Sequence, residues 1–148
     1  IEKLDYILSK DPEFIPANLC KIESLVELGR YKEADEVLKG LSEKYPEVRD
    51  VRLFSAVSLI EIGDRLKDNS FYTRAVEELE FLLRDEPDNI DYSSNIAYAR
   101  ARLGDMDYFE STFLRLLENN PDKKEIIYKY LKLALEKLDI PDRFDTFI

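Results

Sequence analysis

The chain has 148 residues, 45% of them apolar and 36% charged, which is typical of a single domain with a buried core and disfavours intrinsic disorder. Its formal net charge of −10 opposes binding to the phosphates of nucleic acid, and no apolar stretch approaches the roughly 18 residues that span a bilayer. Because the chain has no histidine and one cysteine, it lacks the commonest general base and cannot form an internal disulfide or a multi-thiolate zinc site, so we expect no enzyme activity, cofactor or metal.

Residues 1–14 begin a series of predicted helices. Leu4, Ile7 and Leu8 have helical spacing, and Asp11 and Pro12 follow them as residues typical of a helix end. We interpret this segment as the second helix of a partial unit whose first helix is missing.

Residues 15–48 contain the clearest pair of predicted helices. Ile22, Leu25 and Val26 recur at helical spacing before Gly29, and a second run of this kind ends before Pro46. Glycine closes a helix at little cost because it adopts the left-handed conformation, and proline cannot continue a helix. The segment is therefore expected to form a helix, a tight turn and a second helix.

The prolines show that this pair repeats along the chain. Pro12 and Pro46 are 34 residues apart, and so are Pro87 and Pro121, whereas Pro46 and Pro87 are 41 apart. A fixed spacing of this size is the signature of a repeat protein made of stacked units.

The glycines that we expect to close the first helix of each pair give the same two intervals. Gly29 and Gly63 are 34 residues apart, and Gly63 and Gly104 are 41 apart, so both markers place seven extra residues between Gly63 and Pro87. We assign them to an insertion at 64–70, which either lengthens the neighbouring helices or forms a loop. The predicted domain, 1–148, then consists of a partial unit at 1–14, repeats at 15–48, 49–89 and 90–123, and a partial or capping unit at 124–148.

In each full unit an alanine or its equivalent is followed four residues later by a large apolar residue and then by a proline, as in Ala34, Leu38 and Pro46. With the 34-residue period, this pattern resembles the tetratricopeptide repeat family. Phe109 departs from it, because the family prefers a small residue there. The resemblance implies an all-α, right-handed superhelix of antiparallel helix pairs that serves as a protein–protein interaction scaffold and binds a peptide or helix of a partner in its concave groove.

In this family the first helix of each unit lines the concave groove, and equivalent positions give the candidate binding residues. The resemblance assigns partner binding to Leu19, Glu23, Leu53, Val57, Ile60, Asn95, Tyr98, Arg102, Tyr128 and Lys132. The centre of this surface is apolar and aromatic, and acidic residues including Glu27 and Glu61 surround it, which is typical of a groove for a segment with a basic flank. Alternatively, these residues pack against a longer array or against Phe144 and Phe147.

Some members of the family clamp a terminal carboxylate with lysine and asparagine. Only Asn95 is suitable among the corresponding positions here, so we expect no such clamp. Cys20 lies among apolar residues and is expected to be a small buried side chain, with a thiol in the groove as the alternative.

Other function classes stay open. The chain is alternatively a regulatory or substrate-recruiting segment of a larger enzyme. Arg100, Arg102 and Tyr98 are a combination that stacks RNA bases, but the net charge opposes it and we expect no nucleic-acid partner. The apolar groove is compatible with a homodimer. Since no leader sequence is recognised at Ile1, we expect a cytoplasmic location and no membrane partner.

Overall fold

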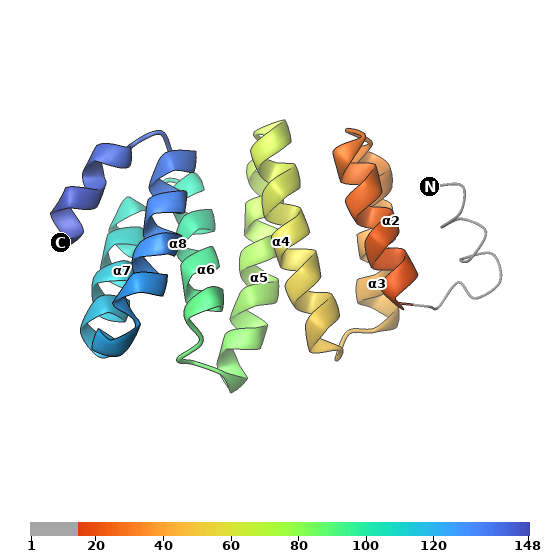
Figure 1. Cartoon of the computed structure of the whole chain (residues 1–148). Helices are drawn as coiled ribbons and strands as arrows, with labels where there is room; N and C mark the ends of the chain where they lie inside the picture. Colours follow the sequence, from red (N-terminus) through yellow and green to blue (C-terminus); the bar gives the residue numbers. More distant parts are fainter. Residues whose placement is uncertain (1–14) are drawn as a thin grey trace. The chain divides into compact units, whose positions relative to one another are not determined.

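The computed structural model of this chain describes residues 15–148, so the partial unit predicted at 1–14 lies outside the described residues. Throughout 15–148 the regular elements are helices and no strand is present, which confirms the all-α fold class (Figure 1). The helices in chain order are α2 (Ile15–Glu27), α3 (Tyr31–Lys44), α4 (Arg49–Leu66), α5 (Asn69–Asp85), α6 (Ile90–Arg102), α7 (Met106–Asn119), η1 (Pro121–Lys123), α8 (Lys124–Lys137) and η2 (Pro141–Phe147). None of these helices is both long and apolar enough to cross a membrane.

The described residues divide into two compact units, unit 1 at residues 15–68 and unit 2 at residues 69–148. In unit 1, α2 packs against α3, and α4 contacts both. In unit 2, α5 packs against α6 and α6 against α7, while α8 contacts both α6 and α7 (Figure 1). Apolar side chains at helical spacing fill the interior of each unit because each helix has one stripe to bury. The largest fully buried side chains are Ile22, Leu25, Leu38 and Ile62 in unit 1 and Leu79, Leu82, Ile96, Phe109, Phe113, Ile127, Leu131 and Leu135 in unit 2.

The four helices α2, α4, α6 and α8 end in the same way, with one residue in the left-handed conformation. After α2, Gly29 has φ +76° and its N–H donates to the Val26 carbonyl at 3.0 Å, while the N–H of Arg30 donates to the Leu25 carbonyl at 2.8 Å. These two hydrogen bonds satisfy carbonyls that the helix end would otherwise leave without a partner. The corresponding left-handed residues are Lys67 after α4 (φ 54°), Gly104 after α6 (φ +97°) and Asp139 after α8 (φ 61°).

Gly63 does not close its helix, and this prediction is wrong. Gly63 is buried inside α4, which continues to Leu66, and the left-handed residue is Lys67. The insertion at 64–70 is the reason, because α4 has 18 residues and α5 has 17, against 13 in α2 and 14 in α3. The extra residues thus add about one turn to the end of α4 and nearly one to the start of α5, on either side of the short turn at Lys67 and Asp68.

Because Lys67 is left-handed, the Lys67→Gly variant is expected to raise the free energy of unfolding by about 0.5–1 kcal/mol. A side chain in this conformation costs about 1–2 kcal/mol, and the gain on removing it is reduced by the greater freedom of glycine in the unfolded chain. Urea denaturation followed by far-UV circular dichroism measures the change. Lys67→Ala is the control, since it removes the charge but keeps Cβ. An equal gain in both variants would show that charge, and not backbone conformation, limits stability here.

The C-terminal segment Pro141–Phe147 forms the 3₁₀ helix η2, with Pro141 in its first turn. The N–H of Arg143 accordingly donates to the carbonyl of Ile140, three residues earlier, at 3.1 Å. Phe147 is buried, and its ring meets that of Phe109 edge-on with centroids 6.5 Å apart. This contact attaches η2 to the core of unit 2.

Candidate functional site

In unit 1, the candidate binding residues lie on α2 and α4. Leu19 and Leu53 are half-buried and Glu23 is exposed. Val57 is 46% exposed, although its neighbours along α4 are buried. Ile60 is buried, with only 5% of its surface exposed, so it serves the interior and offers a partner almost no area.

A pocket of about 250 Å³ lies between α2 and α4 within unit 1. Glu23, Val26 and Glu27 line it from α2, and Ser58 and Glu61 line it from α4. Residues three or four apart share one face of a helix, so both helices present these side chains to the same space. We call this the α2–α4 pocket. The sequence assigned partner binding to only one residue of this pocket, Glu23, and placed Glu27 and Glu61 around the groove. Nothing in the sequence pattern distinguishes Ser58.

Negative charge dominates the α2–α4 pocket. The Glu61 carboxylate lies 3.4 Å from Arg65, one turn along α4, and both side chains are about half exposed. Within residues 15–148, no ion pair joins Glu23 or Glu27 to a cationic side chain. Nor does that part of the chain bring three or more acidic, cysteine or histidine side chains together in a way that could hold a metal ion. The carboxylates of Glu23, Glu27 and Glu61 therefore make the lining of the pocket acidic.

In unit 2, Tyr98 of α6 is buried within a cluster of two cationic side chains. The Nε of Arg102 donates to the Tyr98 hydroxyl at 2.9 Å. The Arg102 guanidinium and the Lys137 Nζ each lie 5.4 Å from the centroid of the Tyr98 ring. Arg102 also donates from Nη2 to the carbonyl of Lys137 at 2.5 Å, which links the C-terminal ends of α6 and α8. Tyr98 and Arg102 thus hold two helices together.

The N-terminal end of α6 is linked to α8 by a second polar cluster. The side-chain amide of Asn95 donates to both the backbone carbonyl and the carboxylate of Asp91, each at 2.9 Å. Burial, together with the charge of Asp91 and a hydrogen bond to it, raises the pKa of Tyr130, so the phenol stays protonated and donates to that carboxylate. The Asn95 amide is therefore already engaged within unit 2.

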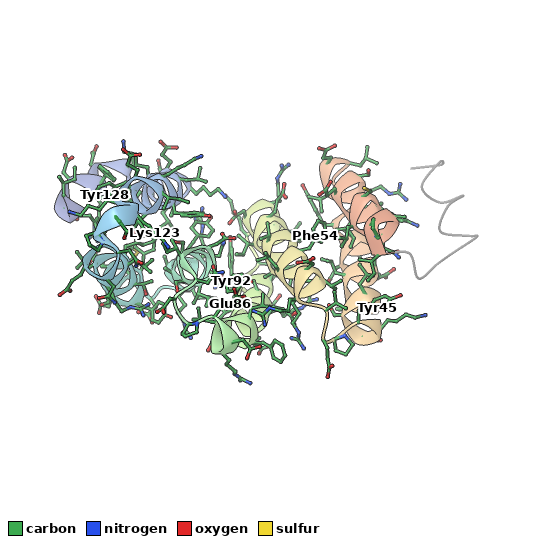
Figure 2. The ribbon with its side chains drawn as sticks, turned by 60° about the horizontal axis from the view of Figure 1, so that its bottom comes forward. Tyr45, Phe54, Glu86, Tyr92, Lys123 and Tyr128 are labelled. Carbon is green, nitrogen blue, oxygen red and sulfur yellow. The ribbon has the colours of Figure 1, made fainter. Side chains whose placement is uncertain are left out.

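The last two candidate residues contact the C-terminal segment. The rings of Tyr128 (labelled in Figure 2) and Phe144 meet edge-on with centroids 5.4 Å apart. The Nζ of Lys132 lies 4.8 Å from the centroid of the same Phe144 ring. For these two residues the geometry favours packing against η2, the alternative that the sequence left open.

The structure also bears on the sequence interpretations of Cys20 and Arg100. Cys20 is exposed, so the expectation of a buried thiol is wrong; the buried stripe of α2 passes through its neighbours Asn18 and Ile22 instead. Arg100, considered for RNA stacking, donates to Glu80 at 3.2 Å and lies over the Tyr108 ring at 4.6 Å.

Tyr92, which lies near these arginines in the sequence, is also engaged. It is buried, and its hydroxyl donates to the Glu86 carboxylate at 3.2 Å; both residues are labelled in Figure 2. The Tyr92 ring therefore offers no open face on which a base could stack.

Comparison with known families identifies one region of the chain. The model of the tetratricopeptide repeat family matches residues 60–124, which run from the end of α4 to the start of α8. No curated protein matches the sequence. Members of the family are typically scaffolds without catalytic activity, and their repeats generally mediate interactions between proteins. Residues 60–124 of this all-α chain therefore match the tetratricopeptide repeat family.

Proposed function

We propose that the chain is a protein-interaction module that binds a peptide or helix of another protein on the exposed surface of its first helices and catalyses no reaction. The observation that carries this proposal is Val57, a β-branched apolar side chain that stays 46% exposed beside the α2–α4 pocket. It precedes Glu61, which lines the pocket, by one helical turn. A partner that covers Val57 would bury this apolar surface, which is favourable in water.

The geometry narrows the set of residues proposed to touch the partner. In unit 1 we assign contact to Leu19, Glu23, Leu53 and Val57, which all retain exposed surface. Ile60 is assigned a supporting role because it is buried.

In unit 2 the proposed contacts are the parts of Asn95, Arg102 and Lys132 that remain exposed. Tyr98 and Tyr128 are assigned supporting roles, because Tyr98 is buried and the Tyr128 ring packs against Phe144.

The Val57→Glu variant tests the proposal. Affinity capture from a lysate of the source organism, followed by titration calorimetry with the purified partner, is expected to show at least a tenfold weaker interaction. The new carboxylate would have to be buried against the partner beside three existing ones, and the transfer of an unpaired charge out of water is costly. Because Val57 is exposed, the helix content measured by circular dichroism should be unchanged.

Leu114→Glu is the matched control. Leu114 is 51% exposed on α7, so this variant makes the same kind of change at a similar exposure on a second helix of a pair. The proposal expects it to bind as the parent does. If Leu114→Glu lost partner binding and Val57→Glu kept it, the interaction would lie on the second helices, and the assignment to the first helices would be overturned.

A further inference from the structure

We infer that the exposed face of α8 binds an amphipathic helix of a partner protein, one whose apolar side chains are flanked by acidic ones. Five residues make up this surface, which we call the α8 face: Ile126, Lys129, Tyr130, Leu133 and Lys137. The inference rests on the proposed function, since it takes the chain to be an interaction module, and it goes further by naming a second surface and the chemistry of its ligand. Exposed apolar side chains and an excess of positive charge carry it.

The apolar part of the α8 face is a stripe that runs beside α6. Ile126, Tyr130 and Leu133 follow one another after four and three residues, so they share one side of the helix. The Tyr130 hydroxyl donates to Asp91 of α6, and the two helices are in contact (Figure 1). Ile126 and Leu133 nevertheless remain 47% and 51% exposed. A helix laid along α8 would cover both, and the burial of apolar surface is favourable in water.

Positive charge is concentrated on the same two helices. α8 contains four lysines and two glutamates, a net charge of +2, and α6 contains two arginines and one aspartate, a net charge of +1. Each of the other described α-helices, α2 to α5 and α7, is neutral or net negative, and the whole chain has a formal charge of −10. The α8 face is therefore a basic surface on an acidic protein, and opposite charge favours a partner segment rich in aspartate or glutamate.

The lysines of α8 are not neutralised by ion pairs of the chain itself. Within residues 15–148, no ion pair joins Lys129, Lys132 or Lys137 to a carboxylate, including those of Glu125 and Glu136 on the same helix. Lys132 and Lys137 instead lie over aromatic rings, at 4.8 and 5.4 Å from the ring centroids. A lysine keeps its full charge in such a contact, so the ammonium groups can still pair with carboxylates of a partner.

A protein helix suits this surface better than a nucleic acid does. Ile126 and Leu133 would be buried favourably only against apolar groups, which a phosphate backbone does not offer, and the net charge of −10 repels a polyanion. An amphipathic helix carries apolar side chains one and two turns apart, which is the spacing of the stripe on α8. The lysines beside the stripe then set the preference for acidic flanks.

The test uses the full chain labelled with ¹⁵N and a helical peptide as long as α8, 14 residues, that is acetylated and amidated. This glutamate peptide has leucine along one side of the helix, glutamate at the flanking positions and alanine elsewhere. A second peptide has glutamine in place of every glutamate, and a third has serine in place of every leucine.

With the glutamate peptide we expect saturable shifts of the backbone amide signals of residues 126–137, with a dissociation constant in the high micromolar to millimolar range. The glutamine and serine peptides should each bind at least fivefold more weakly, because one lacks the charge and the other the apolar anchors. Absence of saturable shifts with the glutamate peptide, or equal affinity for all three peptides, would overturn the inference.

Paired substitutions locate the binding site. Leu133→Gln with Lys129→Gln should weaken binding of the glutamate peptide at least tenfold, since this double variant loses an apolar anchor and a charge. The matched control is Leu114→Gln with Lys32→Gln, because Leu114 of α7 is 51% exposed, as Leu133 is, and Lys32 is an exposed lysine of α3. The control makes the same chemical changes and should leave the affinity within twofold. Equal weakening in both double variants would mean that overall charge and hydrophobicity alone attract the peptide, and the α8 face would be wrong.

Two other occupants of the α8 face would give distinct results. If a second copy of the chain covers it, the amide signals of residues 126–137 will shift when the protein is diluted without peptide. If a nucleic acid is the ligand, a short oligouridylate will bind the α8 face more tightly than the glutamate peptide does. Either result would contradict the inference.

Failure of the inference and failure of the proposed function are distinguishable. If Val57→Glu abolishes binding of a partner but the glutamate peptide shifts no signals of α8, the surface in unit 1 stands and the α8 face is wrong. If the glutamate peptide binds the α8 face selectively and Val57→Glu affects no partner, the α8 face stands and the docking surface assigned around Val57 is wrong.

Discussion

Replacement of Phe109 by alanine is expected to lower the free energy of unfolding by about 3–5 kcal/mol. Phe109 is fully buried in unit 2, and its ring centroid lies 4.9 Å from that of Phe113 and 6.5 Å from that of Phe147. Removal of the ring deletes apolar burial and leaves a cavity that the neighbouring helices fill only in part. Urea denaturation followed by circular dichroism measures the loss.

The stability of the Phe109→Ala variant distinguishes the family preference for a small residue from the packing seen in the structure. The tetratricopeptide pattern prefers a small residue at Phe109, so family preference alone would make Phe109→Ala neutral or stabilising. The structure predicts the opposite, because Phe147 of η2 packs against the same ring. Phe109→Leu is the control and should cost less than about 1.5 kcal/mol, since it keeps most of the volume. A stable Phe109→Ala variant would contradict the packing described for η2.

Replacement of Tyr98 by alanine is expected to lower the free energy of unfolding of unit 2 by about 3 kcal/mol. The Tyr98 ring is buried, meets the Tyr72 ring edge-on with centroids 6.5 Å apart, and carries the Arg102 and Lys137 side chains on its surface. Its truncation removes this packing and the link between α6 and α8 in one step. Urea denaturation of the purified variant is again the measurement.

Tyr98→Phe separates the hydrogen bond from the packing. This variant keeps the ring and loses the acceptor of the Arg102 Nε–H, so the expected decrease in the free energy of unfolding is about 1 kcal/mol. A double-mutant cycle with Arg102→Met isolates their coupling. If Tyr98 were a direct partner contact, Tyr98→Phe would weaken partner binding more than it weakens folding; the structural role predicts unchanged binding at temperatures where the variant is folded.

The contacts of the candidate site were less predictable than the fold. The apolar spacing correctly predicts the helices that contain Cys20 and Val57. Cys20 is nevertheless exposed where a buried side chain was expected, and the exposure of Val57 depends on which surfaces the neighbouring residues cover. α4 buries residues around much of its circumference, including Ser55 and Ser58, so its sequence has no clear polar face from which exposure could be read.

The sequence by itself determined the helical fold, the 34-residue period and the left-handed turns at Gly29 and Gly104. These features depend on short-range effects: the spacing of apolar residues, the ease with which glycine turns left-handed, and the inability of proline to continue a helix. They act within a few residues and are therefore visible in the chain alone.

Only the tertiary structure decided where α4 ends and which candidate residues are accessible. Lys67 rather than Gly63 closes α4, and Phe144 packs against Tyr128 and Lys132. The α2–α4 pocket joins residues that lie more than 30 positions apart in the sequence. Burial and electrostatic environment depend on which helix packs against which, and that choice is made by the sum of many contacts across a unit, whereas a local pattern specifies only one face of one helix.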